Sequence, residues 1–317
     1  MRKGVDSDVD FMTSLLVAAI SAGTPLLLAA LGGILSERSG VINLGTEGIM
    51  LMGAVLTCMT YIQTGSLVVA LAAALLGTAM MGVLHAFLTV TLHANQTVSG
   101  LGITLFGTGL SAYLGKPSSG IPVPGKLPKL DLPWLDSVPL LGKMLAHQDV
   151  MVWASFVLVI AFHLLIYRTS WGLHLRAVGD SPGTADVMGI PVALFRYTYV
   201  IIGSMLMGLA GSYLLLAFSS SWVEGMTSGR GWIAIALIIF ARWNPVRALF
   251  AAYLFGGLDA LGFRIQLLGT PIPSYFLKML PYVITILVLM YVGWKTRNRP
   301  SGQPEALGVP YLREQRH

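Results

Sequence analysis

The stretch Ser36–Gly48, "SERSGVINLGTEG", is the part of the sequence that says most about the fold. It places three charged residues and three glycines between two long apolar runs. Charged side chains are costly inside a bilayer, and glycine permits backbone conformations that interrupt a helix. The sequence therefore raises the question of why a polar, irregular segment lies between two helices that look membrane-embedded.

The composition places the chain among integral membrane proteins. Of its 317 residues, 55% are hydrophobic and 11% are charged, whereas an ordinary soluble domain is about 25% charged. The net charge of +6 comes from basic residues between apolar runs, a pattern that indicates membrane topology rather than nucleic-acid binding. Cys58 is the single cysteine, which excludes a disulfide framework or a thiolate metal site within the chain.

We predict an all-α, polytopic membrane protein with about eight to ten transmembrane helices, forming one membrane domain over residues 1–317. A helix needs about 20 apolar residues to cross the hydrocarbon core. Nine candidate spans follow from that length: Phe11–Leu35, Ile49–Ile62, Leu67–Leu92, Val98–Leu114, Val150–Tyr167, Tyr197–Phe218, Trp232–Ala241, Ala248–Phe263 and Tyr275–Gly293.

The basic residues predict the orientation of these spans. Lys295, Arg297 and Arg299 crowd the end of the last span, and short cytoplasmic loops are enriched in lysine and arginine. This places the tail 294–317 in the cytoplasm. Counting back places the loop 168–196 inside, and the loop 116–148 and the N-terminus outside.

Two glycine-rich breaks suggest internal symmetry. Gly40–Gly48 precedes the second span and Glu224–Gly231 precedes the seventh, and each contains a Glu-Gly pair. With the fifth span as connector, spans one to four and six to nine would be inverted copies with broken helices, as in many transporters. The alternative, that both are ordinary glycine-rich loops, stays open at this point.

The loop 168–196 predicts a short helix over Pro182–Met188. Ser181 suits the N-cap, Pro182 suits the first helical position, and Gly189 suits a left-handed residue after the last turn. A polar helix projecting from the membrane would serve as a docking helix for a cytoplasmic partner, and Ala185, Asp186 and Val187 lie within it. The alternative is a plain linker.

The sequence contains no pattern that indicates catalysis or a bound cofactor. Gly109–Lys116 lacks the spacing and the hydroxyl residue of a phosphate-binding loop, and the histidines lack metal-ligand spacing. No serine lies in a nucleophile elbow. We therefore predict no catalytic, metal or cofactor residue, and expect ATP, if it is used, to be hydrolysed by another subunit.

Polar and aromatic residues within the spans are candidates for a translocation path. We expect Glu47 to cap backbone donors at the start of the second span, and Asp259 to pair with Arg264 or another basic group. The candidate set is Asn43, Glu47, Asn95, Gln96, Ser99, Thr104, Phe106, Trp232 and Asp259.

Four stretches resemble the permease subunits of bacterial ABC importers, with the purine-nucleoside branch closest and the simple-sugar (ribose-type) and branched-chain amino-acid permeases related. They are "LSERSGVINLGTEGIMLMGA" (35–54), "ANQTVSGLGITLFGTGLS" (94–111), "LRAVGDSPGTADVMGI" (175–190) and "GRGWIAIALIIFARWNP" (229–245). Thr46 departs from the apolar residue common in that family.

The resemblance implies a multi-pass permease of the inner membrane that imports a nucleoside or related small polar solute. Its implied partners are a second permease subunit, a cytoplasmic ATP-binding subunit and an extracytoplasmic substrate-binding protein. Ser181–Gly189 falls where this family has its coupling helix, and Gly40–Gly48 where it has a helix break. The nucleoside branch favours a heterodimer of permeases over a homodimer. A sugar permease, a stand-alone secondary transporter and a membrane enzyme are the alternatives.

Overall fold

The structure, a computed structural model, describes residues 2–131, 141–146, 148–267, 273–295 and 302–313, and in these ranges the fold is all-α with only isolated β-bridges. This confirms the predicted fold class. The helices are α1 (Arg2–Arg38), α2 (Thr46–Thr64), α3 (Leu67–Ala86), α4 (Gln96–Gly115), α5 (Leu141–Leu145), α6 (Val150–Arg168), α7 (Ser170–Asp180), α8 (Pro182–Val187), α9 (Val192–Leu214), α10 (Arg230–Phe240), α11 (Pro245–Leu267) and α12 (Ser274–Lys295).

Each of the nine predicted spans coincides with one of these helices. In the part of the chain that the structure describes, six helical segments are long and apolar enough to cross a membrane alone, and Arg230–Phe240 is a shorter apolar helix. A π-helical turn, Phe87–Thr91, extends α3, and another, Leu215–Ser219, extends α9. The predicted multi-span architecture is therefore present.

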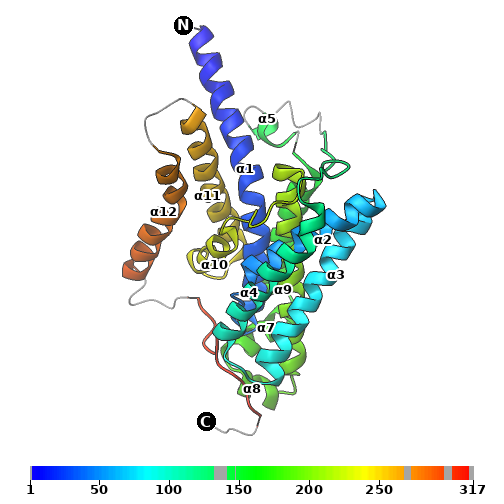
Figure 1. Cartoon of the computed structure of the whole chain (residues 1–317). Coiled ribbons are helices and arrows are strands. Elements are labelled where there is room, and N and C mark those ends of the chain that lie inside the picture. Colours follow the sequence, from blue (N-terminus) through cyan, green and yellow to red (C-terminus); the bar gives the residue numbers. More distant parts are fainter. Residues whose placement is uncertain (1, 132–140, 147, 268–272, 296–301, 314–317) are drawn as a thin grey trace.

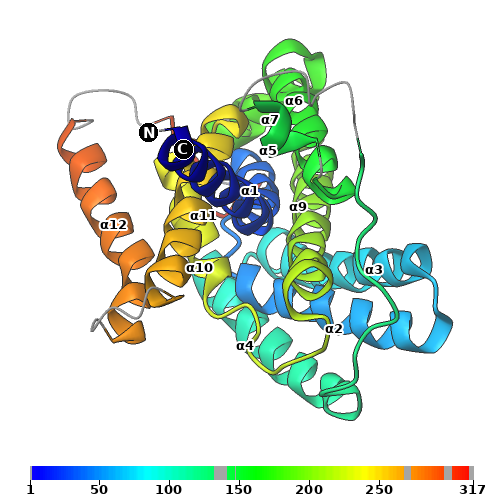
Figure 2. The same ribbon diagram turned by 90° about the horizontal axis from the view of Figure 1, so that it is seen from above.

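The centre of the fold is the crossing of α1 with α9 (Figures 1 and 2). The helix α1 also packs along α11, and in the same way α9 packs along α3. The contact of α1 with α11 in one half thus corresponds to the contact of α9 with α3 in the other, and α1 and α9 contact each other at the centre. The helix α1 runs toward the end that holds α8 while α9 runs away from it, which is the relation that the predicted inverted halves require (Figure 1).

Glycines allow α2 and α9 to pack backbone against backbone. A Cβ atom on Gly211 would overlap the carbonyl oxygen of Met50, and one on Gly53 would overlap the carbonyl oxygen of Gly208. Close approach through small residues is the usual way for membrane helices to gain packing contacts. This crossing holds the first helix of one half against the second helix of the other.

The end of α1, the end of α6 and the chain after α10 meet at the end of the molecule that holds the loop 168–196, which is predicted to be cytoplasmic (Figure 1). The Arg38 guanidinium at the end of α1 donates to the Trp243 carbonyl oxygen at 3.1 and 3.2 Å and to the Tyr167 hydroxyl at 3.1 Å. At the opposite end, Val123 N–H donates to the Ser220 carbonyl oxygen at 2.8 Å. The sidedness itself stays a prediction.

Several of the residues on which the prediction of sidedness rests are not among those that the structure describes. Arg297 and Arg299 fall outside the described residues, as does most of 132–147 within the external loop.

Candidate functional site

The helix α10 is too short to cross a membrane. Its 11 residues span about 16 Å at about 1.5 Å per residue, against a hydrocarbon core of about 30 Å. The chain just after α10 is fixed beside the end of α1, where the Trp243 indole N–H donates to the Glu37 carboxylate at 2.6 Å. The N-terminus of α10 therefore lies inside the chain's helical region, away from that anchored end, and its first N–H groups need partners other than those of a preceding helical turn.

The Glu47 carboxylate satisfies these donors. It accepts hydrogen bonds from Gly229 N–H at 2.9 Å, from Gly231 N–H at 2.6 Å and from the Thr227 hydroxyl. A negative charge is favourable at the positive end of a helix, and the Glu47 side chain is almost completely buried. The prediction that Glu47 caps its own helix is wrong, because its carboxylate caps α10 while its backbone lies in the first turn of α2.

The two predicted helix breaks thus meet at one point. The first break, Gly40–Gly48, follows α1, and the second, Glu224–Gly231, follows α9. The two approach so closely that a Cβ atom on Gly231 would lie 2.6 Å from the Glu47 Cα atom. Glu224, the acid of the second Glu-Gly pair, is exposed instead. The pairing is therefore asymmetric, with one acid at the contact between the halves.

Asn43 stabilises the first break through a hydrogen bond within the break and another to α9. Its side-chain oxygen accepts from Gly45 N–H at 3.0 Å, and its amide nitrogen donates to the Ser204 hydroxyl on α9 at 3.4 Å. The prediction that Asn43 satisfies exposed backbone groups is confirmed. The side chain is buried and faces α9.

Side chains from α3 and α4 satisfy the rest of the first break. Gln96 accepts from Ile42 N–H at 2.7 Å, the Thr104 hydroxyl donates to the Leu44 carbonyl oxygen at 2.7 Å, and His85 Nε2 lies 2.9 Å from the Ile42 carbonyl oxygen. Irregular backbone inside a membrane needs such partners. His85 was missed as a member of this group, because an isolated histidine carries no spacing signal.

Asn95 and Ser99 complete the set of neutral polar candidates. Asn95 is the N-cap of α4 and accepts from Val98 N–H at 3.1 Å, and Ser99 Oγ lies 3.0 Å from His85 Nδ1. The hydrogen bonds of these two residues and of Gln96 and Thr104 are made within the chain. Their place in a translocation path stays a prediction.

Two aromatic candidates face outward. The Phe106 residue on α4 is 50% exposed and Trp232 on α10 is 39% exposed. The helices that carry them, α4 and α10, both contact α2. Both rings are therefore accessible at the surface of the chain, and their place in a translocation path stays a prediction.

Asp259 on α11 pairs with a different arginine from the one named in the prediction. Its carboxylate lies 2.9 Å from the Arg230 guanidinium at the start of α10, and Arg264 instead donates to the Ser14 hydroxyl at 2.8 Å. Both charges line a cavity of about 260 Å³, together with Leu26, Ser228, Ile233, Phe255, Phe263 and Tyr282.

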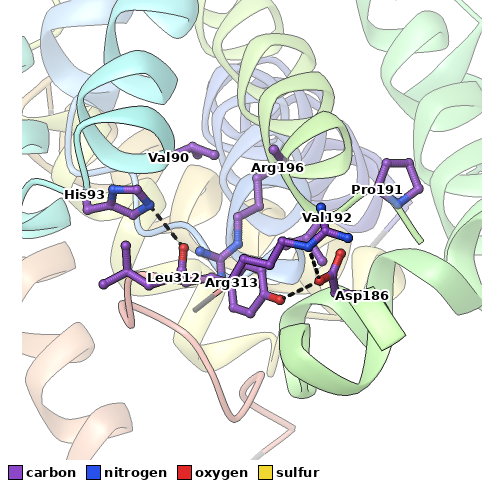
Figure 3. A pocket seen from close by; sticks show the side chains of 10 residues that line it. Val90, His93, Asp186, Pro191, Val192, Arg196, Leu312 and Arg313 are labelled. Atoms are coloured by element: carbon purple, nitrogen blue, oxygen red, sulfur yellow. Dashed lines mark hydrogen bonds and ion pairs between the residues drawn. The ribbon is translucent and has the colours of Figure 1, made fainter. Parts of the chain in front are cut away.

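The projecting helix α8 has the predicted position and ends at Val187, and Gly189 follows with φ of +83°. Ser181 occupies the N-cap position, but its hydroxyl lies 2.8 Å from the Thr184 hydroxyl and does not cap a backbone N–H. Ala185 is buried, whereas Val187 and Met188 are 87% and 77% exposed. Val187 and Met188 therefore form an exposed apolar tip. Beside it, Asp186 of the same helix meets Arg313 of the tail (Figure 3).

Known proteins place the chain in a family. The family described as "Branched-chain amino acid transport system / permease component" matches residues 15–289. The chain is 39% identical to a putative glucose ABC transporter permease protein, TsgC13, of Haloferax volcanii, over 96% of this chain and 99% of that protein. No solved structure matches.

Two relatives from Bacillus subtilis are named for guanosine. The guanosine ABC transporter permease protein NupQ is 34% identical over 97% of this chain and 99% of its own length. A second one, NupP, is 24% identical over 85% of this chain and 78% of its own length. Together with the family match, these similarities show that the chain belongs to the permease components of ABC transporters, multi-pass proteins of the inner membrane whose ATP is hydrolysed by a separate subunit.

Proposed function

We propose that the chain forms half of the translocation path of an ATP-driven importer for an uncharged nucleoside, with a simple sugar as the alternative substrate. The observation that carries this proposal is the meeting of the two helix breaks at Glu47. In transporters, substrate sites lie where such broken helices meet near the bilayer midplane. The exposed rings of Phe106 and Trp232 lie on the helices beside this point.

The charges near this point are compensated, which favours an uncharged solute. Glu47 is held by the N-terminus of α10, and Asp259 is paired with Arg230. Among the residues that line the cavity beside α10, Arg230 is the one basic side chain, and it is already paired with Asp259. A phosphate group would have to be stripped of water there without a cationic partner, which is costly.

The partners that we propose are a second permease, an ATP-binding subunit at α8 and a substrate-binding protein at the opposite face. Two guanosine permeases from one organism are both similar to this chain, which favours a heterodimer. In this arrangement, movement of α8 upon ATP binding would tilt α7 and α9 and open the path alternately to each side.

The substrate class is tested by the ATPase activity of the reconstituted complex with its ATP-binding and substrate-binding partners. We expect stimulation by guanosine or another nucleoside, and none by the corresponding 5′-monophosphate. Ribose and glucose are tested as the third class of ligand, after the nucleosides and the monophosphate. Stimulation by sugars alone would replace the nucleoside assignment with the sugar one, and stimulation by the monophosphate would contradict the argument from charge compensation.

The docking role of α8 is tested with Val187→Ser combined with Met188→Ser. Removing two exposed apolar side chains from an interface costs about 1–3 kcal/mol, so we expect co-purification of the ATP-binding subunit to fall by about tenfold. Val68→Ser on α3 is the matched control, because Val68 is similarly exposed but lies at the start of a helix whose other end reaches the α8 side. Undiminished co-purification would show that the subunit docks elsewhere.

A further inference from the structure

The described part of the C-terminal tail, residues 302–313, runs back across the end of the molecule that holds α8 (Figure 1). Its backbone is tied to two elements along the way. Ala306 N–H donates to the Gly179 carbonyl oxygen on α7 at 3.0 Å, and Gly308 N–H donates to the Gly40 carbonyl oxygen in the first break at 3.2 Å. The tail is therefore built into the fold at the end of α1.

Further along, the tail contacts α9 and the chain after α3. The Arg196 guanidinium donates to the Val309 carbonyl oxygen at 3.3 Å, and His93 Nε2 lies 3.1 Å from the Tyr311 carbonyl oxygen (Figure 3). Arg196 is 1% exposed, so the tail covers a basic side chain at the base of α9. The tail segment 306–311 thus contacts α7, the first break, α9 and the chain after α3.

The end of the tail holds the coupling helix. The Tyr311 hydroxyl donates to the Asp186 carboxylate at 3.0 Å, and Arg313 Nε lies 3.0 Å from the same oxygen (Figure 3). Burial, together with the hydrogen bond to Asp186, raises the pKa of Tyr311, so that its hydroxyl keeps the proton that it donates. Both contacts converge on one side chain of α8.

The helix α8 has few other attachments to the membrane helices. Among its residues only Ala185 is buried. A cavity of about 690 Å³, lined by residues of α9, α8 and the tail, lies beside Asp186. The tail therefore bridges a gap in the packing between α8 and the rest of the fold.

We propose that residues 302–313 form a second mechanical connection, which carries movement of α8 to α1 and α9 in addition to the covalent connections through α7 and α9. In this role, which rests on the proposed function of α8, Asp186, Tyr311 and Arg313 are positioning residues. Without them α8 still docks on the ATP-binding subunit, but part of its movement is lost as local rotation. ATP is then hydrolysed with less transport.

The first experiment measures substrate transported per ATP hydrolysed in the reconstituted complex, for Tyr311→Phe combined with Arg313→Gln. Losing an exposed ion pair and a hydrogen bond costs little stability, and we expect this ratio to fall by about fivefold while the ATP-binding subunit still co-purifies. Glu305→Gln is the matched control, because it removes an exposed charge from the same segment. Asp186→Ala added to the double variant should lower the ratio no further, because all three side chains act through one contact.

The second experiment does not depend on any partner. Hydrogen exchange of the purified chain in detergent should show the amides of Ala185–Gly189 exchanging about fivefold faster in the double variant than in Glu305→Gln, because a restraint on local opening is removed. Unchanged exchange or an unchanged transport ratio would overturn the proposal. Loss of co-purification in the double variant would also overturn it, since the tail would then be a docking surface. Failure of the wild-type complex to couple ATP to transport would instead contradict the proposed function, whatever the exchange result.

Discussion

Changing Glu47 to glutamine is expected to lower transport by about tenfold or more, since a hydrogen bond to a charged group contributes about 1.5–3 kcal/mol and about 1.4 kcal/mol corresponds to tenfold. The wild-type carboxylate accepts from Gly229 N–H, Gly231 N–H and the Thr227 hydroxyl. A glutamine amide directs its own N–H₂ group at one of these donors. Uptake into proteoliposomes and the thermal unfolding midpoint measure the loss.

Glu224→Gln provides the control for this change. It is the same substitution at the Glu-Gly pair of the other half, where the side chain is exposed, and we expect transport and unfolding midpoint to match the wild type. Equal losses in both variants would show that a general charge effect is responsible. Wild-type behaviour of Glu47→Gln would contradict the role of the carboxylate as the cap of α10.

This contact between the two breaks illustrates what the sequence can and cannot predict. The glycines and acids of Gly40–Gly48 and Glu224–Gly231 indicate two interrupted helices, because such residues disfavour continuous helix. Which backbone Glu47 caps depends on a contact between residues about 180 positions apart. Local preferences do not encode that contact, so the prediction placed the carboxylate on its own helix.

The helix α8 shows the same division between what the sequence predicts and what it does not. Pro182 and Gly189 fix where α8 begins and ends, since each suits one backbone conformation, and these bounds follow from the sequence. The partner of Asp186 lies in a tail that has no periodic pattern, and it was not predicted. Asp259 was expected to pair with Arg264 or another basic group, and the packing of α10 against α11 makes Arg230 that group.

Substituting alanine for Gly211 is expected to have the largest effect on folding. A Cβ atom there would overlap the backbone carbonyl oxygen of Met50, and a backbone atom cannot move aside as a side chain can. The helices α2 and α9 would have to separate along their crossing, at a cost above the about 1–3 kcal/mol of ordinary overpacking. We expect almost no monodisperse protein after detergent extraction and size-exclusion chromatography.

Gly102→Ala tests whether this loss is specific to the crossing. Gly102 lies on α4, and a Cβ atom there would meet nothing within 4 Å, so its yield and unfolding midpoint should stay at the wild-type level. The comparison holds the substitution constant and changes only the neighbour. A monodisperse Gly211→Ala protein with a wild-type midpoint would mean that α2 and α9 do not pack backbone to backbone, and the central position of Glu47, which depends on that packing, would lose its basis.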